Sequence, residues 1–156
     1  MAREHFDAGV ELQKQEKDEE AIAEYDQAIE LYPEYAEAYN QRGSAYLYLD
    51  RPGQALQDYD QAIVLDSSFA EAYNNRGAAY SQMGKYEQAI RDYEQAILHN
   101  LDYAAAYNNR GTAYHLLGQD ERAIKDFNDA ISLDPEYAEA YINRGVAYIQ
   151  LEQIDR

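Results

Sequence analysis

The sequence predicts an all-α protein built as a solenoid of antiparallel helix pairs. Three observations lead to this class: a 34-residue internal repeat, helical spacing of small and aromatic residues within each repeat, and a helix-breaking segment between its halves. Internal periods of roughly 20–50 residues are typical of stacked repeat proteins. The chain has 156 residues, so we expect one domain over 1–156.

Glycine, alanine and aromatic residues carry the repeat, and each recurs at intervals of 34 residues. The first-half set is Tyr39, Tyr73, Tyr107 and Tyr141; Gly43, Gly77, Gly111 and Gly145; and Tyr46, Tyr80, Tyr114 and Tyr148. The second-half set is Ala21, Ala55, Ala89 and Ala123; Tyr25, Tyr59, Tyr93 and Phe127; and Ala28, Ala62, Ala96 and Ala130.

The spacing inside one repeat predicts two helices. In both halves the recurring residues lie at i, i+4 and i+7, which places them on one helix face. The segment 50–53, Asp-Arg-Pro-Gly, separates the halves, and Pro52 suits the first turn of a helix. We therefore expect helices near 36–49 and 52–65, and again 34 and 68 residues further on.

A glycine recurs in the middle of each first helix, where it costs about 1 kcal/mol relative to alanine. Glycine is explained at this position if a neighbouring helix approaches closely, because glycine has no side chain in the way. We expect alanines such as Ala55 to face the glycine and tyrosines to fill the space beside it.

The order aromatic, Gly, Tyr, Ala, aromatic, Ala resembles the tetratricopeptide-repeat (TPR) family. The segment from Ala70 to Tyr80, Ala-Glu-Ala-Tyr-Asn-Asn-Arg-Gly-Ala-Ala-Tyr, matches the first-helix pattern of that family closely. The resemblance implies a right-handed TPR superhelix and covers essentially the whole chain. It implies repeats at 2–35, 36–69, 70–103 and 104–137, with 138–156 as the first helix of an incomplete fifth repeat.

Some positions depart from the family pattern. His5 stands where the other repeats have tyrosine, so the first repeat resembles a degenerate cap. The closing proline of the family is present as Pro33 and Pro135 and replaced by Ser67 and Leu101. The pattern ends at Arg156, where a second helix is expected to start, which leaves a fragment of a longer protein and an engineered chain as alternatives.

The resemblance implies that a peptide or protein segment binds in the groove lined by the first helices. The residues at the matching positions are Asn40, Gln41, Ser44, Tyr48, Asn74, Asn75, Ala78, Gln82, Asn108, Asn109, Thr112, His115 and Asn143.

A carboxamide column is expected within this groove. Its members are Gln41, Asn75, Asn109 and Asn143. A carboxamide offers both a donor and an acceptor, so it can pair with the backbone of an extended segment. The alternative is that these residues only keep an exposed helix face hydrated.

One specialised TPR function does not fit the sequence. The clamp that holds the acidic C-terminal tails of heat-shock chaperones needs two Lys, two Asn and one Arg over three adjacent first helices. Only one slot fits in the best register, where the residues are Asn40, Ser44, Asn75, Ala105 and Asn109. The other registers contain Glu71 or Glu139, which would repel a carboxylate.

Arginines and acids recur with the same period. The arginines are Arg42, Arg76, Arg110 and Arg144, and the acids are Glu24, Asp58, Asp92 and Asp126. Pairing each acid with the arginine of the next repeat uses all eight groups. We therefore expect inter-repeat salt bridges from Glu24–Arg42 through Asp126–Arg144; a phosphate or acidic-ligand site at the arginines is the alternative.

Composition argues against several classes of function. The net charge of −17 predicts no nucleic-acid or membrane partner, and the absence of cysteine excludes disulfides, zinc–thiolate sites and thiol catalysis. The three histidines are far apart, so we expect no metal and no cofactor. The chain start lacks the apolar stretch of a signal peptide and no apolar run approaches a membrane span, so we expect a cytoplasmic protein.

Two functions remain as hypotheses, and neither is enzymatic. The first is a protein-interaction scaffold that binds an extended peptide or partner segment of unknown identity in the groove. The second is self-assembly through the terminal helix, whose apolar face lacks its usual cover; its residues are Tyr141, Val146, Tyr148 and Ile149. We expect no enzyme, because no phosphate loop, catalytic carboxylate pair or Ser/His/Asp arrangement stands out.

Overall fold

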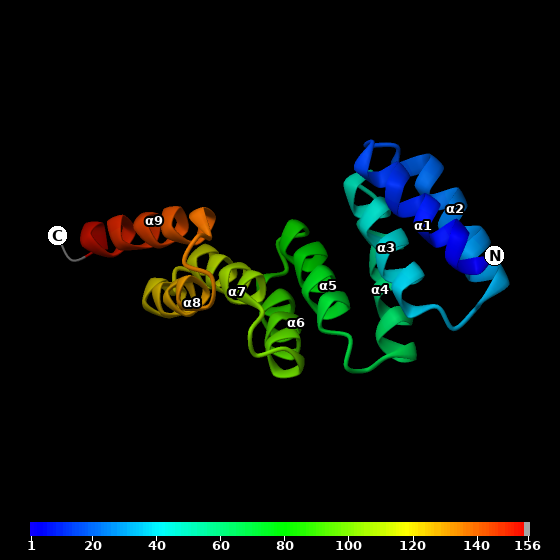
Figure 1. Cartoon of the computed structure of the whole chain (residues 1–156). Coiled ribbons are helices and arrows are strands. Elements are labelled where there is room, and N and C mark those ends of the chain that lie inside the picture. Colours follow the sequence, from blue (N-terminus) through cyan, green and yellow to red (C-terminus); the bar gives the residue numbers. More distant parts are fainter. Residues whose placement is uncertain (155–156) are drawn as a thin grey trace. The chain divides into compact units, whose positions relative to one another are not determined.

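A computed structural model describes residues 1–154, which form nine α-helices and no strand (Figure 1). No helix in this part of the chain combines the length and the apolar character needed to cross a lipid bilayer. The helices are α1 (Ala2–Lys14), α2 (Asp18–Leu31), α3 (Ala36–Tyr48), α4 (Pro52–Leu65), α5 (Ala70–Gln82), α6 (Tyr86–His99), α7 (Ala104–Leu116), α8 (Asp120–Leu133) and α9 (Ala138–Ile154).

The helix positions confirm the expected 34-residue period. First helices begin at residues 2, 36, 70, 104 and 138, and second helices begin at 18, 52, 86 and 120. The helices expected near 36–49 and 52–65 are observed at 36–48 and 52–65. Pro52 is the first residue of α4, where its missing N–H leaves no hydrogen bond unmade.

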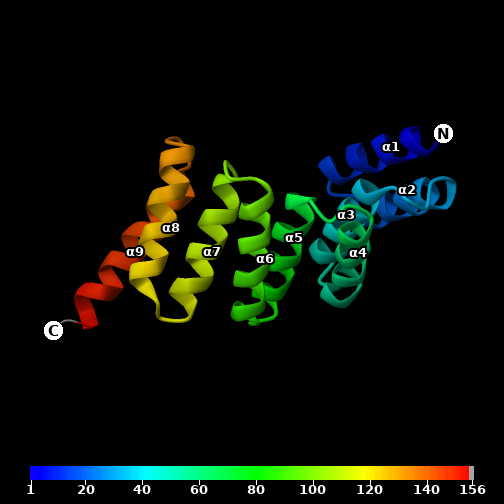
Figure 2. The ribbon, with the colours of Figure 1, turned by 90° about the horizontal axis from the view of Figure 1, so that it is seen from below.

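The helices form two compact units, and the division falls within α5. In the first unit, Met1–Ala79, α1 packs on α2, α2 on α3 and α3 on α4. In the second unit, which begins at Tyr80, α6 packs on α7, α7 on α8 and α8 on α9 (Figure 2). Successive helices within a unit run antiparallel, as the sequence predicts.

In the turn after each of α1, α3, α5 and α7, one residue has a left-handed backbone conformation. Gly84 and Gly118 both have φ of +71°. Glu16 and Asp50 hold the same position in their repeats with φ of 59° and 56°. Glycine adopts this conformation without the steric cost of a side chain, which explains its choice in two of the four turns.

A side-chain oxygen holds the turn that leads into the next repeat. Asp66, Asn100 and Asp134 each accept the backbone N–H two residues further on, at 2.9, 3.2 and 3.0 Å. This Asx hydrogen bond stabilises the turn without requiring a proline. The turn therefore forms where Ser67 and Leu101 replace the closing proline of the family.

An aromatic ring of the second helix lies directly over the glycine of the first helix. A Cβ added to Gly43 would lie 2.8 Å from Cε1 of Tyr59, and only glycine leaves room for a ring at that distance. The same contact joins Gly9 to Tyr25 and Gly111 to Phe127. The alanine four residues before each ring is fully buried at Ala21, Ala55 and Ala123. The expected close approach is confirmed at these three glycines.

We expect Gly111→Ala to lower the free energy of unfolding by about 1–3 kcal/mol, because the new Cβ would lie 2.7 Å from the Phe127 ring and overpack the contact. The matched control is Gly145→Ala in α9, where no described atom lies within 4 Å of the added Cβ. This change should stabilise by up to about 1 kcal/mol through helix propensity. Urea unfolding measures both, and equal effects would contradict the assigned contact.

Candidate functional site

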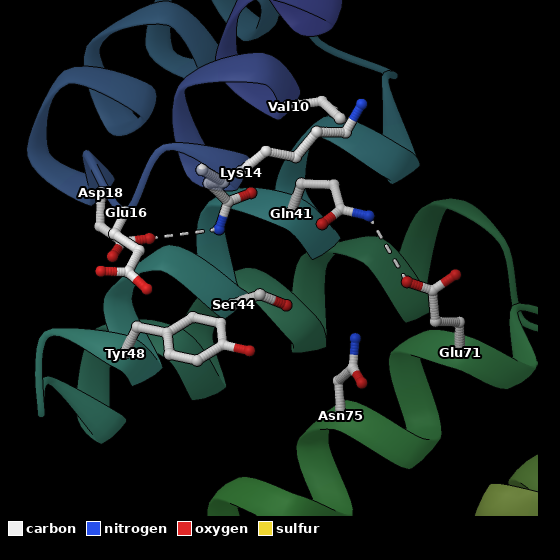
Figure 3. A pocket seen from close by; sticks show the side chains of 10 residues that line it. Val10, Lys14, Glu16, Asp18, Gln41, Ser44, Tyr48, Glu71 and Asn75 are labelled. Carbon is white, nitrogen blue, oxygen red and sulfur yellow. Dashed lines mark hydrogen bonds between the residues drawn. The ribbon is translucent and has the colours of Figure 1, made fainter.

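The first unit contains an open pocket of about 800 Å³ on the face of its first helices (Figure 3). Four expected groove residues line it, namely Gln41, Ser44, Tyr48 and Asn75. The others come from α1, the turn after it, the start of α2 and the first turn of α5; they are Val10, Gln13, Lys14, Glu16, Asp18 and Glu71.

The residues from α1 and α2 were missed by the sequence analysis, because the first repeat resembled a cap. The 34-residue period contains the signal that identifies two of them. Val10 holds the repeat position of Ser44, and Lys14 holds that of Tyr48. The first repeat therefore contributes pocket residues from the same two repeat positions as the second repeat does.

The lining of the pocket is polar and carries more negative than positive charge. Figure 3 shows Glu16 and Asp18 on one side and Glu71 on the other. Lys14 is the one basic lining residue, and its Nζ lies 3.3 Å from an exposed glutamate, Glu11. The arrangement favours a ligand with neutral polar or cationic groups over an anionic one.

Tyr48 supplies the exposed aromatic surface of the pocket. Tyr48 is the last residue of α3, and it is 81% exposed. A tyrosine ring gives a bound segment apolar area and a hydroxyl at little cost in side-chain entropy. Tyr48 is therefore the residue of the pocket best suited to anchor a partner.

A buried asparagine connects neighbouring first helices beneath the pocket. Asn40 is fully buried, and its Nδ2 donates to Oε1 of Glu71 at 2.9 Å. Its Oδ1 accepts from Nδ2 of Asn75 at 3.1 Å. Gln41 also donates weakly to Glu71, at 3.5 Å. This network holds Glu71 and Asn75 in fixed positions at the pocket edge.

The second unit repeats the network residue by residue. Asn108 is fully buried and donates to Glu139 at 3.2 Å. Its Oδ1 accepts from Asn143 at 3.1 Å, and Asn143 also reaches Oγ1 of Thr112 at 3.4 Å. The recurrence shows that asparagine at this repeat position links successive first helices.

Burial separates the expected carboxamides into two groups. Asn40, Asn74 and Asn108 have exposed fractions of 0, 7 and 0%. These three side chains are packed within the protein, so they offer a partner much less surface than the groove prediction assumed. Members of the second group, Gln41, Asn75, Asn109 and Asn143, are all half-buried.

The other expected groove residues differ in exposure. Ser44 and Thr112 are half-buried, and each hydroxyl donates to the backbone oxygen four residues earlier, at 3.2 and 3.0 Å. Ala78 is half-buried and Gln82 is exposed. The hydrogen-bond donor of each hydroxyl is thus already paired within its own helix.

His115 does not hold the groove position assigned to it. Its Nδ1 lies 2.5 Å from Oδ1 of Asp120, the first residue of α8. By the 34-residue period, His115 corresponds to Leu47, whereas Leu116 corresponds to Tyr48. Leu116 is 51% exposed, so it shares both the repeat position and the exposure of Tyr48.

Arg42 and Arg110 each pair with an acid of their own repeat, which corrects the expected inter-repeat pairing at these two positions. Arg42 makes two hydrogen bonds to Asp58, at 2.8 and 2.7 Å. Arg110 makes the same two bonds to Asp126, at 2.7 and 2.8 Å. Paired N–H···O bonds of this kind are among the strongest in proteins. In the first repeat Ala8 stands at the position of Arg42, and Glu24 lies 2.6 Å from His5 Nδ1 instead.

A second acid series supplies the contacts between repeats. Arg42 reaches Asp26 at 2.5 Å, and Arg76 reaches Asp60 at 2.7 Å. In α9, Arg144 donates instead to the side-chain oxygen of Asn128, at 2.6 Å. This series lies two residues after the first and has the same period, so spacing alone could not decide between them.

The arginines are also stacked on the tyrosine three residues earlier. The distance from Cζ to the ring centroid is 5.4 Å for Arg42 on Tyr39 and 5.6 Å for Arg110 on Tyr107. Charge on both sides and a ring beneath fix these guanidinium groups within the packing. Their positions favour a structural role over a phosphate or acidic-ligand site.

Burial determines the titration of the groups beside these contacts. It raises the pKa of the Asp58 and Asp126 carboxyls above the ordinary value, while the adjacent arginine lowers it in part. Burial also raises the pKa of the Tyr59 hydroxyl to about 12, so this ring remains neutral at its contact with Gly43.

Taken together, these observations define a class of protein: a helical repeat array built from antiparallel helix pairs. One family model, described as tetratricopeptide repeat, matches residues 70–103. A second, described as TPR repeat, matches residues 9–50, 53–84 and 113–151. The chain belongs to the tetratricopeptide-repeat family, whose domains are typically protein-interaction modules.

Solved structures show the same fold. A crystal structure of the MamA protein has a TM-score of 0.82 and 28% identity, over 99% of this chain and 84% of that one. The first TPR of Spaghetti (RPAP3), bound to the HSP90 peptide SRMEEVD, has a TM-score of 0.73 and 26% identity, over 75% of this chain and 93% of that one.

A third neighbour is the second TPR domain of human RPAP3 in complex with the HSP70 peptide SGPTIEEVD. Its TM-score is 0.70 and its identity 31%, over 72% of this chain and 94% of that one. A comparison with curated proteins found no match. The chain is therefore similar to TPR domains that were solved with peptides bound, and to MamA over nearly its full length.

We expect Arg110→Met to destabilise the protein by about 3 kcal/mol, because it leaves the Asp126 carboxylate buried without its partner. The loss of Arg110 should raise the pKa of Asp126 further above 3.8, the ordinary value. The folded state then binds a proton more readily than the unfolded state. The deficit should be largest at neutral pH and shrink as the pH falls toward 4.

Urea unfolding between pH 7 and pH 4 measures this effect. Arg91→Met, at an exposed position of α6, is the control and should change stability little at either pH. A deficit for Arg110→Met that is small, or that grows on acidification, would contradict the assigned pair.

Proposed function

We propose that the chain is a protein-interaction scaffold that binds an extended segment of a partner on the face of its first helices. The observation that carries this proposal is the open pocket of the first unit, which combines an exposed aromatic ring, Tyr48, with half-buried amides, Gln41 and Asn75. Amides suit the backbone of an extended chain, and the ring suits one side chain.

The similar TPR domains support this mode of binding. Both RPAP3 structures hold peptides, and each covers more than two thirds of this chain. Recognition through a rigid, preformed surface keeps the entropic cost of binding low. In this proposal the network of Asn40, Glu71 and Asn75 supplies the rigidity, because it fixes the pocket edge from below.

The proposed partner segment is neutral or basic, unlike the peptides of the RPAP3 structures, which end in Glu-Glu-Val-Asp. Three carboxylates line the pocket against one lysine, Lys14. Of the five positions that hold an acidic chaperone tail in the family, Asn40 is buried here and Ala105 carries no charge. The carboxylates of an acidic peptide would be repelled by the carboxylate of Glu71.

We propose further that the chain acts by binding and not by catalysis. The recurring arginines, the buried asparagines and the glycines Gly9, Gly43 and Gly111 have contacts that explain them by packing. Among residues 1–154, no group of three histidines or carboxylates has the arrangement of a metal site. The exposed and half-buried residues of the first helices have no such structural explanation, and in this proposal they form the surface that binds the partner.

Tyr48→Ala tests the pocket directly. Peptides selected from a random library against the wild-type chain should bind this variant at least tenfold more weakly, because the ring is the main apolar contact. Val64→Ala is the matched control: Val64 is 76% exposed in the same unit but lies on a second helix, α4. Titration calorimetry measures both, and equal affinities for Tyr48→Ala and wild type would contradict the proposal.

The charge preference is tested with the acidic peptide SRMEEVD. We expect no binding to this chain at millimolar peptide, and selected peptides should carry lysine or arginine in excess of acidic residues. Their affinity should fall as the salt concentration rises, because screening weakens attraction between opposite charges. Micromolar binding of SRMEEVD would contradict the proposed class of partner.

A further inference from the structure

One side of the pocket in the first unit combines an exposed ring with two carboxylates. Tyr48 supplies the ring, and Figure 3 shows Glu16 and Asp18 on the same side of the pocket. Glu16 is exposed and Asp18 is half-buried, so both line the pocket from its surface. We call these three side chains the Tyr48 subsite.

Neither carboxylate of the Tyr48 subsite forms an ion pair within residues 1–154. Asp18 accepts a hydrogen bond from the neutral amide of Gln13, at 3.5 Å. The buried acids of the helix packing differ in this respect, because Asp58 and Asp126 are each paired with an arginine. The two carboxylates of the subsite are therefore open to a cation from another molecule.

The nearby lysines do not neutralise the subsite. Lys14 lines the same pocket, but its Nζ lies 3.3 Å from Glu11, and Figure 3 shows its side chain directed away from Glu16 and Asp18. Lys17 is exposed and is not part of the pocket lining. The field inside this side of the pocket therefore attracts positive charge.

The interior of the chain shows what a ring and two carboxylates can hold. The guanidinium group of Arg42 lies over the ring of Tyr39, with 5.4 Å from Cζ to the ring centroid. The same group contacts the carboxylates of Asp58 and Asp26. A guanidinium group suits these partners because its flat face stacks on a ring while its N–H groups bond to carboxylates at the edge.

Tyr48 offers the same kind of ring without a cation over it in the described part of the chain. The Tyr48 subsite thus presents the same kinds of group that surround Arg42, but on the wall of an open pocket of about 800 Å³. The group that completes such an arrangement is a guanidinium, and in the pocket it has to come from the ligand.

We propose that the Tyr48 subsite binds an arginine side chain of the partner segment. The guanidinium group stacks on the Tyr48 ring and donates hydrogen bonds to Glu16 and Asp18. Lysine fits less well, because an ammonium group is compact and has neither a flat face nor a fixed fork of N–H groups. This inference rests on the proposed function, and it names the residue type by which the pocket selects its partner.

The probes are mixtures of acetylated, amidated hexapeptides that differ at the third residue, which is arginine, citrulline, lysine or methionine. The other residues are drawn from uncharged types (Ala, Ser, Thr, Asn and Val). Citrulline has the shape of arginine without its charge, so it is the matched control. Mass spectrometry identifies the peptides that the immobilised whole chain captures. The strongest binder is then made with each of the third residues, and titration calorimetry measures its affinity.

We expect the arginine peptide to bind at least about tenfold more tightly than the citrulline peptide, because the charged hydrogen bonds and the stacking are lost together. The lysine peptide should bind about threefold more weakly than the arginine peptide. Equal binding of the arginine and citrulline peptides overturns this inference and leaves the proposed function standing. Failure of the chain to capture any mixture would overturn both.

Glu16→Gly removes one carboxylate of the subsite without disturbing the turn. Glu16 has φ of 59° at the repeat position where Gly84 and Gly118 have +71°, so this variant should be at least as stable as the wild-type chain, which a thermal melt verifies. We expect the ratio of arginine to citrulline affinity to fall at least about threefold, because one of the two opposite charges is lost.

Asp50→Gly is the matched control for this variant. Asp50 holds the same turn position in the next repeat of the same unit, with φ of 56°, but it does not line the pocket. The change in net charge and in backbone is the same, so the affinity ratio should stay that of the wild-type chain. An equal fall for both variants would assign the preference to overall charge and overturn the subsite.

Tyr48→Leu tests the contribution of the ring. Leucine keeps apolar area but has no π-system on which a guanidinium group can stack. The ratio of arginine to lysine affinity should therefore fall to about one in this variant. An unchanged ratio would show that the arginine does not stack on Tyr48, and it would overturn the inference.

Discussion

The contact of an aromatic ring with a glycine, repeated from pair to pair, is the constraint on which the rest of the structure depends. The ring can lie on the first helix only where no Cβ stands in its way, as at Gly43 and Tyr59. This contact brings two helices close together, and the close approach admits only alanine at neighbouring core positions such as Ala55. Helix pairs of fixed geometry result, and the 34-residue period stacks them.

The polar contacts depend on this spacing and decide which surface is left for a partner. Arg42 can reach Asp58 in its own repeat and Asp26 in the previous one only because the helices are close. The amide of Asn40 likewise spans the distance to Glu71. Once these groups are used internally, the surface for recognition consists of half-buried amides and exposed rings. A protein that binds through fixed helices gains a preformed surface in this way.

Sequence reasoning predicted the helices of the second to fourth repeats within one residue, because the glycine and ring positions determine their faces and the turn segments between them determine their limits. It was wrong about the ion pairs, since two acid series share the period: Arg42 contacts Asp58 of its own repeat and Asp26 of the previous one, and spacing does not show which series serves which role. It could not foresee the burial of Asn40, which depends on the distance between first helices. The error at His115 was one of register, which a strict count of 34 residues from Leu47 would have avoided.

The most direct test is a double-mutant cycle between Gly43→Ala and Tyr59→Ala, followed by urea unfolding. If the ring and the glycine are in contact, Gly43→Ala should destabilise the wild-type chain but should be neutral or stabilising once Tyr59→Ala has removed the ring. Strictly additive effects of the two changes would show that the ring does not lie on the glycine, and the account of the fold would then be wrong.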